Sequence, residues 1–202
     1  MITPEKAEII GLLCAEGSHI IQFSNYLQYY KNRKKYYLKR NDKSERIEFF
    51  NNDQKLLLHL KLLLKKVYNY EVNISGNKIR ICKNHVIYDL LKYSEYKNME
   101  WRVPKEVTLG NKKIILRFIR GYFDGDGTVS NRLRMFSTNK IGLKQVFRLL
   151  NKIGIRCNLV GPEIKPDRKP LHVLYVLESQ KKRFLNMVKP ISKIPGLCGD
   201  NH

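Results

Sequence analysis

The chain has 202 residues and a formal net charge of +21 at pH 7, from 39 Lys and Arg against 18 Asp and Glu. Such a length suffices for one good hydrophobic core or two small ones. So large a positive charge favours a polyanionic partner, nucleic acid before an anionic membrane surface. The most apolar segment, residues 56–64, is interrupted by His59 and Lys61, which excludes a membrane span.

The four cysteines are scattered, without a Cys-x-x-Cys pair, which favours buried, reduced thiols over a metal site or a disulfide framework. No signal peptide precedes Glu5 and Lys6. We therefore expect an intracellular, DNA-associated protein, in a prokaryotic cytoplasm or in an organelle.

The first predicted element is a helix over residues 4–16, capped by Thr3 and with Pro4 in its first turn. It is apolar on nearly every side, so we expect it to be covered by its own sheet and by a second element. Its end reads Ile-Ile-Gly-Leu-Leu-Cys-Ala-Glu-Gly and places Glu16 at the helix C-terminus, where the helix dipole disfavours a carboxylate.

Residues 19–50 are rich in aromatic and β-branched residues without a helical period, which predicts two or three strands with a basic turn around residues 31–35. A Leu-rich helix follows over residues 54–67. A hairpin over residues 72–83 is expected to turn at Gly76-Asn77, and a short helix over residues 85–93 closes this half.

A second apolar helix is predicted from Lys112, and Phe118–Gly127 reads Phe-Ile-Arg-Gly-Tyr-Phe-Asp-Gly-Asp-Gly. A shift of 110 positions places Gly121 on Gly11, Gly125 on Ala15 and Asp126 on Glu16. Gly127 is expected to end the helix in a left-handed conformation. Taken alone, the end of this stretch reads as an ordinary Asp-Gly turn, but the recurrence of helix, small-residue stripe and terminal acid indicates an internal duplication.

The rest of the second half repeats the first. Residues 132–139 correspond to residues 46–53 with an offset of 86, so the first half carries an insertion of 24 residues in its strand region. A helix over residues 140–153, strands at residues 156–160 and 171–178, and a helix from about residue 180 follow. Each half therefore reads helix, two strands, helix, two strands, helix.

These motifs resemble the LAGLIDADG homing endonucleases, in their single-chain, two-repeat form. The resemblance implies an α+β fold of two pseudo-symmetric αββαββα repeats, each with a saddle-shaped antiparallel sheet. The two motif helices would pack at the centre through Gly11, Ala15, Gly121 and Gly125. We expect an N-terminal repeat over residues 1–95, a linker over residues 96–111 and a C-terminal repeat over residues 112–202.

Two motif helices that end side by side would bring Glu16 and Asp126 together, and adjacent carboxylates repel each other unless a cation neutralises them. Oxygen ligands of this kind suit Mg²⁺, with Mn²⁺ or Ca²⁺ able to substitute in binding. The metal positions expected are Glu16, Asp126, Ala15 and Gly125. With one acid in each half, one site would face each strand of a duplex.

The resemblance further implies a divalent-metal-dependent, site-specific double-stranded DNA endonuclease, intron-encoded, that hydrolyses one phosphodiester in each strand and leaves short 3′ overhangs. Asn51 and Ser137 then join Glu16 and Asp126 as catalytic positions. Some relatives carry a Lys where Asn52 and Thr138 stand, so the basic residue that assists the chemistry is open. Lys83 and Lys165 are candidates.

The predicted strands present outward polar and cationic side chains that could read a major groove, Arg at guanine and Gln at adenine. These candidates are Gln22, Ser24, Gln28, Lys39, Arg46, Arg80, Arg132 and Arg134. For any one of them, a solvated sheet face is an equally good interpretation. The partner implied is a long, asymmetric duplex DNA target bound by a monomer with internal pseudo-twofold symmetry, with intron RNA as a further possibility.

Two other hypotheses remain. A non-cleaving binder on the same scaffold, such as an intron RNA maturase, has no reason to keep two carboxylates facing a polyanion, so we favour the nuclease. An endonuclease embedded in an intein is the second alternative. Met1 offers no splicing Cys or Ser at the first position and the sequence ends at Asn201-His202, so we expect a free-standing protein.

Overall fold

The computed structural model describes residues 2–97, 99–164 and 166–192. The N-terminal repeat consists of α1 (Pro4–Glu16), β1 (Gly17–Tyr30), the single turn η1 (Lys31–Arg33), β2 (Lys35–Phe50), α2 (Gln54–Tyr68), β3 (Ile74–Ser75), β4 (Lys78–Ile81) and α3 (Asn84–Leu91). After the short α4 (Lys105–Thr108), the C-terminal repeat consists of α5 (Lys112–Asp126), β5 (Gly127–Val129), β6 (Leu133–Ser137), α6 (Lys140–Lys152), β7 (Cys157–Glu163), β8 (Leu171–Val176) and α7 (Glu178–Val188).

The two repeats have the same topology. Their four-stranded antiparallel sheets have the orders β1-β2-β4-β3 and β5-β6-β8-β7, which are equivalent strand for strand. This confirms the predicted α+β fold with two αββαββα repeats. Within the described residues no helix combines the length and the apolar character that a bilayer crossing requires.

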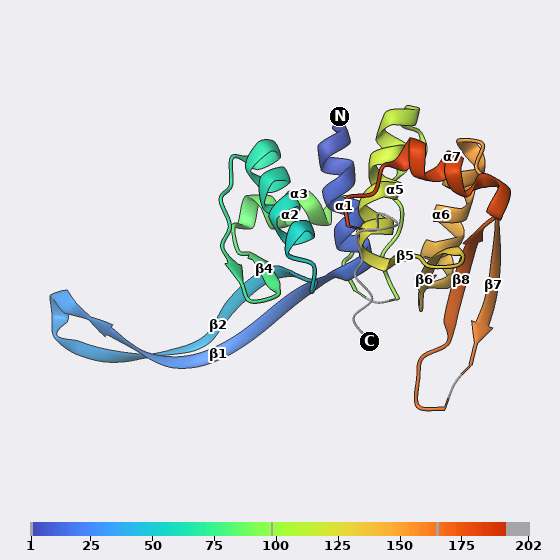
Figure 1. Ribbon diagram of the computed structural model, residues 1–202. Helices are drawn as coiled ribbons and strands as arrows, with labels where there is room; N and C mark the ends of the chain where they lie inside the picture. The colour runs from blue at the N-terminus through green and yellow to red at the C-terminus, as the bar shows by residue number, and fades with distance from the viewer. Residues whose placement is uncertain (1, 98, 165, 193–202) are drawn as a thin grey trace.

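The 24-residue difference between the repeats lies in the first hairpin. β1 and β2 pair from Gly17 with Phe49 out to Tyr30 with Lys35, with one shift of register between Ser24 and Tyr26, whereas the equivalent β5 ends at Val129. The distal part of this hairpin leaves the body of the molecule as an arm, drawn in blue in Figure 1. The insertion is therefore an elongation of two strands, with a tight turn at η1.

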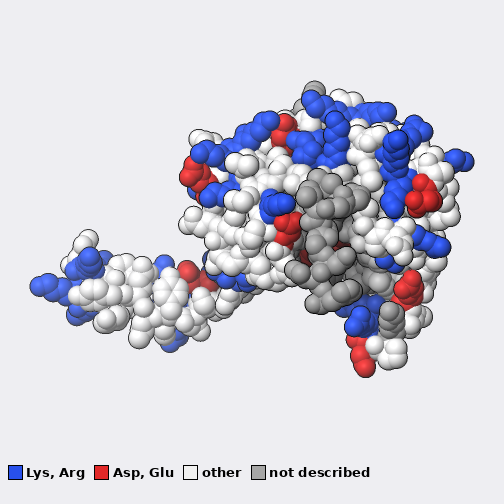
Figure 2. All heavy atoms as spheres, in the orientation of Figure 1, with Lys and Arg blue, Asp and Glu red and all other residues white. Residues whose placement is uncertain are grey.

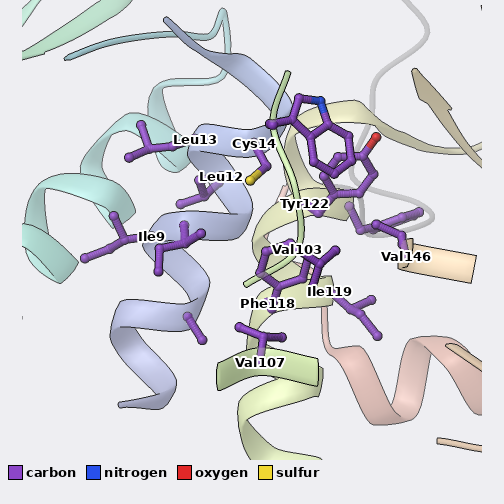
Figure 3. Close-up of a cluster of buried hydrophobic side chains, with 14 of the residues drawn as sticks. Ile9, Leu12, Leu13, Cys14, Val103, Val107, Phe118, Ile119, Tyr122 and Val146 are labelled. Carbon is purple, nitrogen blue, oxygen red and sulfur yellow. The ribbon is translucent and has the colours of Figure 1, made fainter. Parts of the chain in front are cut away.

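The helices α1 and α5 lie side by side at the centre of the molecule, between the two sheets (Figure 1). Their backbones touch at two glycines. A Cβ at Gly11 would lie 2.2 Å from the carbonyl oxygen of Phe118, and a Cβ at Gly121 would lie 2.2 Å from that of Glu8. Around this contact one continuous apolar cluster joins the repeats (Figure 3).

The prediction of a left-handed conformation at Gly127 is wrong. Its φ of −89° and ψ of 163° are extended, and Gly17 at the end of α1 is similar, with φ −84° and ψ 149°. Each motif helix runs directly into the first strand of its repeat. Glycine is needed at Gly127 for space, because a Cβ would lie 2.3 Å from the ring of Phe123.

The segment between the repeats is packed rather than loose. Tyr96, Trp101, Val103 and Val107 are all buried. Figure 3 shows Val103 and Val107 beside α5, in the cluster that also contains residues of α1. These four side chains therefore contribute to the core that both repeats share.

The cysteines that the structure describes, Cys14, Cys82 and Cys157, are free, and Cys14 and Cys157 are buried as predicted. Cys82 is exposed, so the prediction of burial is wrong for this residue. It directly follows the last residue of β4, Ile81. Cys198 lies outside the described residues.

Candidate functional site

A cavity of about 270 Å³ lies where α1 and α5 end. Glu16 and Asp126, the last residues of the two motif helices, both line it. The remaining wall comes from the residues around Glu16, from the end of β6 and from the segment between the repeats. The structure thus brings together Glu16 and Asp126, the two acids that the internal duplication of the sequence indicated.

The close packing of small residues accounts for this convergence. A Cβ at Gly125 would lie 2.4 Å from the Cβ of Ala15 and 3.3 Å from the Cγ of Glu16. Because Gly125 carries no side chain, the end of α1 can approach α5 closely enough for both terminal carboxylates to reach one cavity. Ala15 and Gly125 have only backbone oxygen atoms to offer a cation.

The charge of Asp126 acts on two buried groups nearby. Burial raises the pKa of the Cys14 thiol to about 12, and the Asp126 carboxylate adds to this increase. Burial likewise raises the pKa of Tyr122 well above its usual value, again with a contribution from Asp126. The Tyr122 hydroxyl donates to the carbonyl oxygen of Phe136 at 3.0 Å, which connects α5 to β6 beside the cavity.

Asp124, the other acid of the second motif, has a different environment. It is 1% exposed and accepts hydrogen bonds from the backbone N–H groups of Ile191 (2.9 Å) and Ser192 (3.1 Å). Burial raises the pKa of Asp124, while these backbone hydrogen bonds oppose the increase. Its contacts hold the chain that follows α7 against α5, so Asp124 is a structural residue.

Asn51 and Ser137 occupy equivalent turns. The Asn51 Oδ1 accepts from the N–H of Asp53 at 2.9 Å, and the Ser137 Oγ accepts from the N–H of Asn139 at 3.0 Å. Ser137 lines the cavity with Glu16, whereas Asn51 is not among the residues that form its wall. The two strand ends have the same local hydrogen bond, but of these two residues only Ser137 forms part of the cavity wall.

Glu16 and Asp126 are suited to an oxygen-coordinated divalent cation. In the described part of the chain, no three His, Cys, Asp or Glu side chains are grouped as a ready-made metal cage. Magnesium does not require one, since it commonly binds to one or two carboxylates and takes waters and substrate phosphate oxygens as its other ligands. Two carboxylates on one open cavity fit that coordination.

The predicted DNA-contact residues of the first sheet share its outer face. Ile47, Phe49, Ile79 and Ile81 are buried, and the alternate positions along β2 and β4 therefore point away from the core. Cross-strand pairs place Gln22 opposite Ser44, Ser24 opposite Asp42 and Arg80 opposite Glu48. The other candidates are Arg46 and Lys39 on β2 and Gln28 on β1.

Glu48 organises this face, although no pattern in the sequence marks it. Its Oε1 accepts from Arg46 Nε at 2.8 Å and from Arg80 Nε at 3.0 Å. The hydrogen bond from Arg46 is the largest cause that lowers the pKa of Glu48. Arg46 also donates to Gln22 Oε1 at 3.3 Å, so these side chains form one preorganised polar network.

The outer face of the second sheet carries the other two candidates. Arg134 alternates with the buried Leu133 and Met135, donates to the Ser130 hydroxyl at 3.1 Å and lies over the ring of Phe136. Arg132 is exposed in the turn between β5 and β6 and lines a second, larger hollow of about 780 Å³.

The lysine at the carboxylate cavity was not predicted. Lys97, from the segment between the repeats, lines the cavity with Glu16 and Asp126. Lys83 lies over the ring of Tyr70 instead, and Lys165 falls outside the described residues. No spacing or motif in the sequence marks Lys97, because its position depends on how the segment packs between the repeats.

Residues 113–189 match the family of LAGLIDADG-like domains. The chain is 26% identical over 190 residues to the homing endonuclease I-DmoI of Desulfurococcus mucosus, a match that covers 91% of this chain and 86% of that protein. It is also 30% identical over 186 residues to a DNA polymerase of Methanocaldococcus jannaschii, and 28% identical over 156 residues to a probable translation initiation factor IF-2 of the same organism. These two matches cover 86% and 68% of this chain, but the chain spans only 10% and 12% of the length of those relatives.

Solved structures share the fold. Variants of I-DmoI superpose with a TM-score of 0.64 at 20% identity, over 94% of this chain and 98% of theirs. I-DmoI in complex with DNA and Mn superposes with a TM-score of 0.60 at 19% identity, over 92% of this chain and 96% of that chain. The N-terminal LAGLIDADG domain of DUF199/WhiA superposes with a TM-score of 0.56 at 14% identity, over 93% of this chain and 84% of that chain.

Proposed function

Since the chain is a two-repeat protein of the LAGLIDADG homing endonuclease family, we propose that it is a site-specific DNA endonuclease that cuts both strands of a duplex with the help of a divalent metal ion. The single observation that carries this proposal is the meeting of Glu16 and Asp126 in one cavity. Each acid comes from a different repeat, at the end of a helix that packs against its counterpart.

Glu16 and Asp126 are the residues that would hold the metal ion, with the backbone carbonyl groups of Ala15 and Gly125 beside them. A divalent ion held there would supply an activated water and stabilisation of the charge on the leaving 3′ oxygen. The Ser137 hydroxyl, held by its turn, can orient a water molecule or a phosphate oxygen. Mg²⁺ is the ion that we propose for the reaction, and Ca²⁺ or Mn²⁺ can replace it in binding.

Duplex DNA is the partner that the sheet faces support. The network of Gln22, Arg46, Glu48 and Arg80 holds two guanidinium groups in place on the first sheet, as base readout in a major groove requires. The long β1–β2 arm has no equal in the second repeat, which supports an asymmetric target. A monomer with two repeats contributes one acid for each strand. Because its substrate is DNA, we propose that the protein is found where the DNA of the cell lies.

The target can be identified by selection from a randomised pool of duplexes in Ca²⁺. A selected duplex is then cloned into a supercoiled plasmid, and Mg²⁺ starts the cleavage reaction. We expect linear plasmid with the wild-type chain and none when EDTA removes the metal. Binding should weaken on the order of a thousandfold between low and moderate salt if about six phosphates are contacted. Retained binding without any cut would instead identify a non-cleaving nucleic-acid-binding protein, such as a maturase.

Replacement of either acid tests the assignment of the site. We expect Glu16→Gln and Asp126→Asn each to abolish double-strand cleavage, while affinity for the selected duplex in EDTA stays within about threefold, because a lost carboxylate removes repulsion rather than a DNA contact. Glu106→Gln, on the exposed surface of α4, is the matched control and should cut normally. Cleavage of both strands at the wild-type rate by either acid variant would refute the assigned site.

A further inference from the structure

The carboxylate cavity presents an electrostatic difficulty to DNA. Glu16 and Asp126 both face it, and a phosphodiester that enters brings a further negative charge. Among the described residues that form its wall, Lys97 is the one Lys or Arg side chain. Within the described part of the chain, the positive charge on this wall therefore comes from the segment that joins the repeats, and not from either sheet or either motif helix.

The backbone of Lys97 is fixed on the side of the first repeat. The N–H of His19, in β1, donates to the carbonyl oxygen of the preceding residue, Tyr96, at 2.8 Å. Tyr96 itself is fully buried and its hydroxyl donates to the carbonyl oxygen of Leu90 at 2.9 Å. These contacts place Lys97 beside the start of β1, next to the end of α1 that carries Glu16.

The second repeat holds the same segment from the other side. The carbonyl oxygen of Lys97 accepts from the N–H of Trp101 at 3.4 Å, and the carbonyl oxygen of Trp101 accepts from Asn139 Nδ2 at 2.7 Å. Trp101 is 3% exposed and packs so closely on α6 that a Cβ at Gly142 would lie 2.5 Å from its ring. The turn that bears Lys97 is thus wedged between the repeats.

The Lys97 side chain remains free to reach a ligand. Its Nζ lies 3.2 Å from a carboxylate oxygen of Glu100 and 3.8 Å from one of Glu95, and the side chain is 53% exposed. Ion pairs this exposed contribute little, about 0–1 kcal/mol, so a phosphate group can displace them. Neither Glu95 nor Glu100 lines the carboxylate cavity, and Lys97 also lines a neighbouring hollow with Glu95, so the ammonium group exchanges these partners for phosphate when DNA binds.

We propose that Lys97 is a catalytic residue of one of the two strand cleavages, an inference that rests on the proposed endonuclease function. Its ammonium group donates to a non-bridging oxygen of the scissile phosphate and stabilises the charge that accumulates there as water attacks phosphorus. The attacking water forms the new P–O bond and releases a proton to solvent, the P–O3′ bond breaks, the 3′ oxygen takes a proton from solvent, and a 5′ phosphate remains. Lys97 keeps its proton throughout.

A catalytic Lys97 should act on only one of the two strands. Lys97 belongs to the single segment between the repeats, so the internal duplication does not supply it twice. Loss of its charge should slow one strand and spare the other. A purely structural role for Lys97 would slow both strands together, and the ratio of the two rates therefore distinguishes the two roles.

The experiment follows supercoiled plasmid with the selected target through nicked to linear product, with each strand labelled. We expect Lys97→Met to slow one strand by about a hundredfold or more, on the scale of removing one transition-state hydrogen-bond donor, so that nicked plasmid accumulates. Affinity for the duplex in Ca²⁺ should fall by less than about tenfold, with the salt slope reduced by about one. Lys97→Arg should restore most of the rate.

Lys92→Met is the matched control, because Lys92 is a more exposed lysine that lies outside the cavity wall and pairs with Asp89 at 4.0 Å. It should cut both strands like the wild-type chain. If Lys97→Met also cut both strands at the wild-type rate, or slowed both equally, the role of Lys97 would be refuted while the nuclease stood. A wild-type chain that bound the duplex but left the plasmid intact in Mg²⁺ would refute the nuclease itself.

Discussion

At the scale of single residues, the centre of the molecule depends on two glycines. The carbonyl oxygen of Phe118 and that of Glu8 occupy the space where a Cβ at Gly11 or Gly121 would be. Alanine would favour an isolated helix by about 1 kcal/mol, yet here it would force two backbones apart.

We therefore expect Gly11→Ala and Gly121→Ala each to lower the free energy of unfolding by about 2 kcal/mol, as overpacking of a tight core does. Urea denaturation measures the change. Lys113→Ala, at an exposed position of α5, is the control and should differ from the wild-type chain by less than about 0.5 kcal/mol. Equal stability of the glycine variants and the control would contradict the close contact of the two helices.

Glu16 and Asp126 could be predicted from the sequence because the duplication repeats both the acid and the small residues before it. Asp124 and Lys97 could not be assigned in this way. Asp124 belongs to the motif but binds backbone N–H groups near residue 191, and Lys97 reaches the cavity only through contacts with both repeats. Sequence periodicity reports which face of an element is buried, whereas these roles depend on where distant segments meet.

At the scale of elements, the β1–β2 arm is the feature that breaks the symmetry. The two different offsets between the repeats predicted an insertion and its length, but not that it would lengthen two paired strands. Many of its side chains are apolar and uncovered, including Phe23 and Leu27 at 65% exposed. Basic residues gather at its tip, where Figure 2 shows a blue cluster beyond a mostly white middle.

Shortening this arm should shorten the DNA footprint on one side only. Replacement of residues 26–40 by a two-residue Asn-Gly turn removes a stretch of β1 about 17 Å long, which corresponds to about five base-pair steps. We expect hydroxyl-radical protection to retreat by that amount at one end of the target. Stability should change by less than about 1 kcal/mol, because the deleted side chains are mostly exposed. An unchanged footprint would show that the arm does not lie along the DNA.

At the scale of the whole molecule, a buried charge cluster and a shared core join the repeats. Glu8 of α1 is fully buried. One of its carboxylate oxygens lies 2.6 Å from Arg120 Nε and 2.8 Å from His59 Nε2, and the other lies 2.9 Å from Arg117 Nε. Its partners come from α2 of the first repeat and α5 of the second. The apolar cluster around it continues from one repeat into the other, which predicts that the two unfold together.

Glu8→Gln tests this coupling, because it removes the negative charge between two arginines. Loss of one member of a buried ion pair costs about 3 kcal/mol, so we expect a loss of that size. Glu71→Gln, whose side chain is 70% exposed beside Lys65, should cost less than about 1 kcal/mol. Trp101, the one tryptophan of the chain, lies between the repeats and reports on their contact. If the fluorescence of Trp101 and the far-ultraviolet circular dichroism of either variant follow the same urea transition, the repeats unfold as one unit. A fluorescence change at lower urea than the change in circular dichroism would mean that the repeats separate before they unfold.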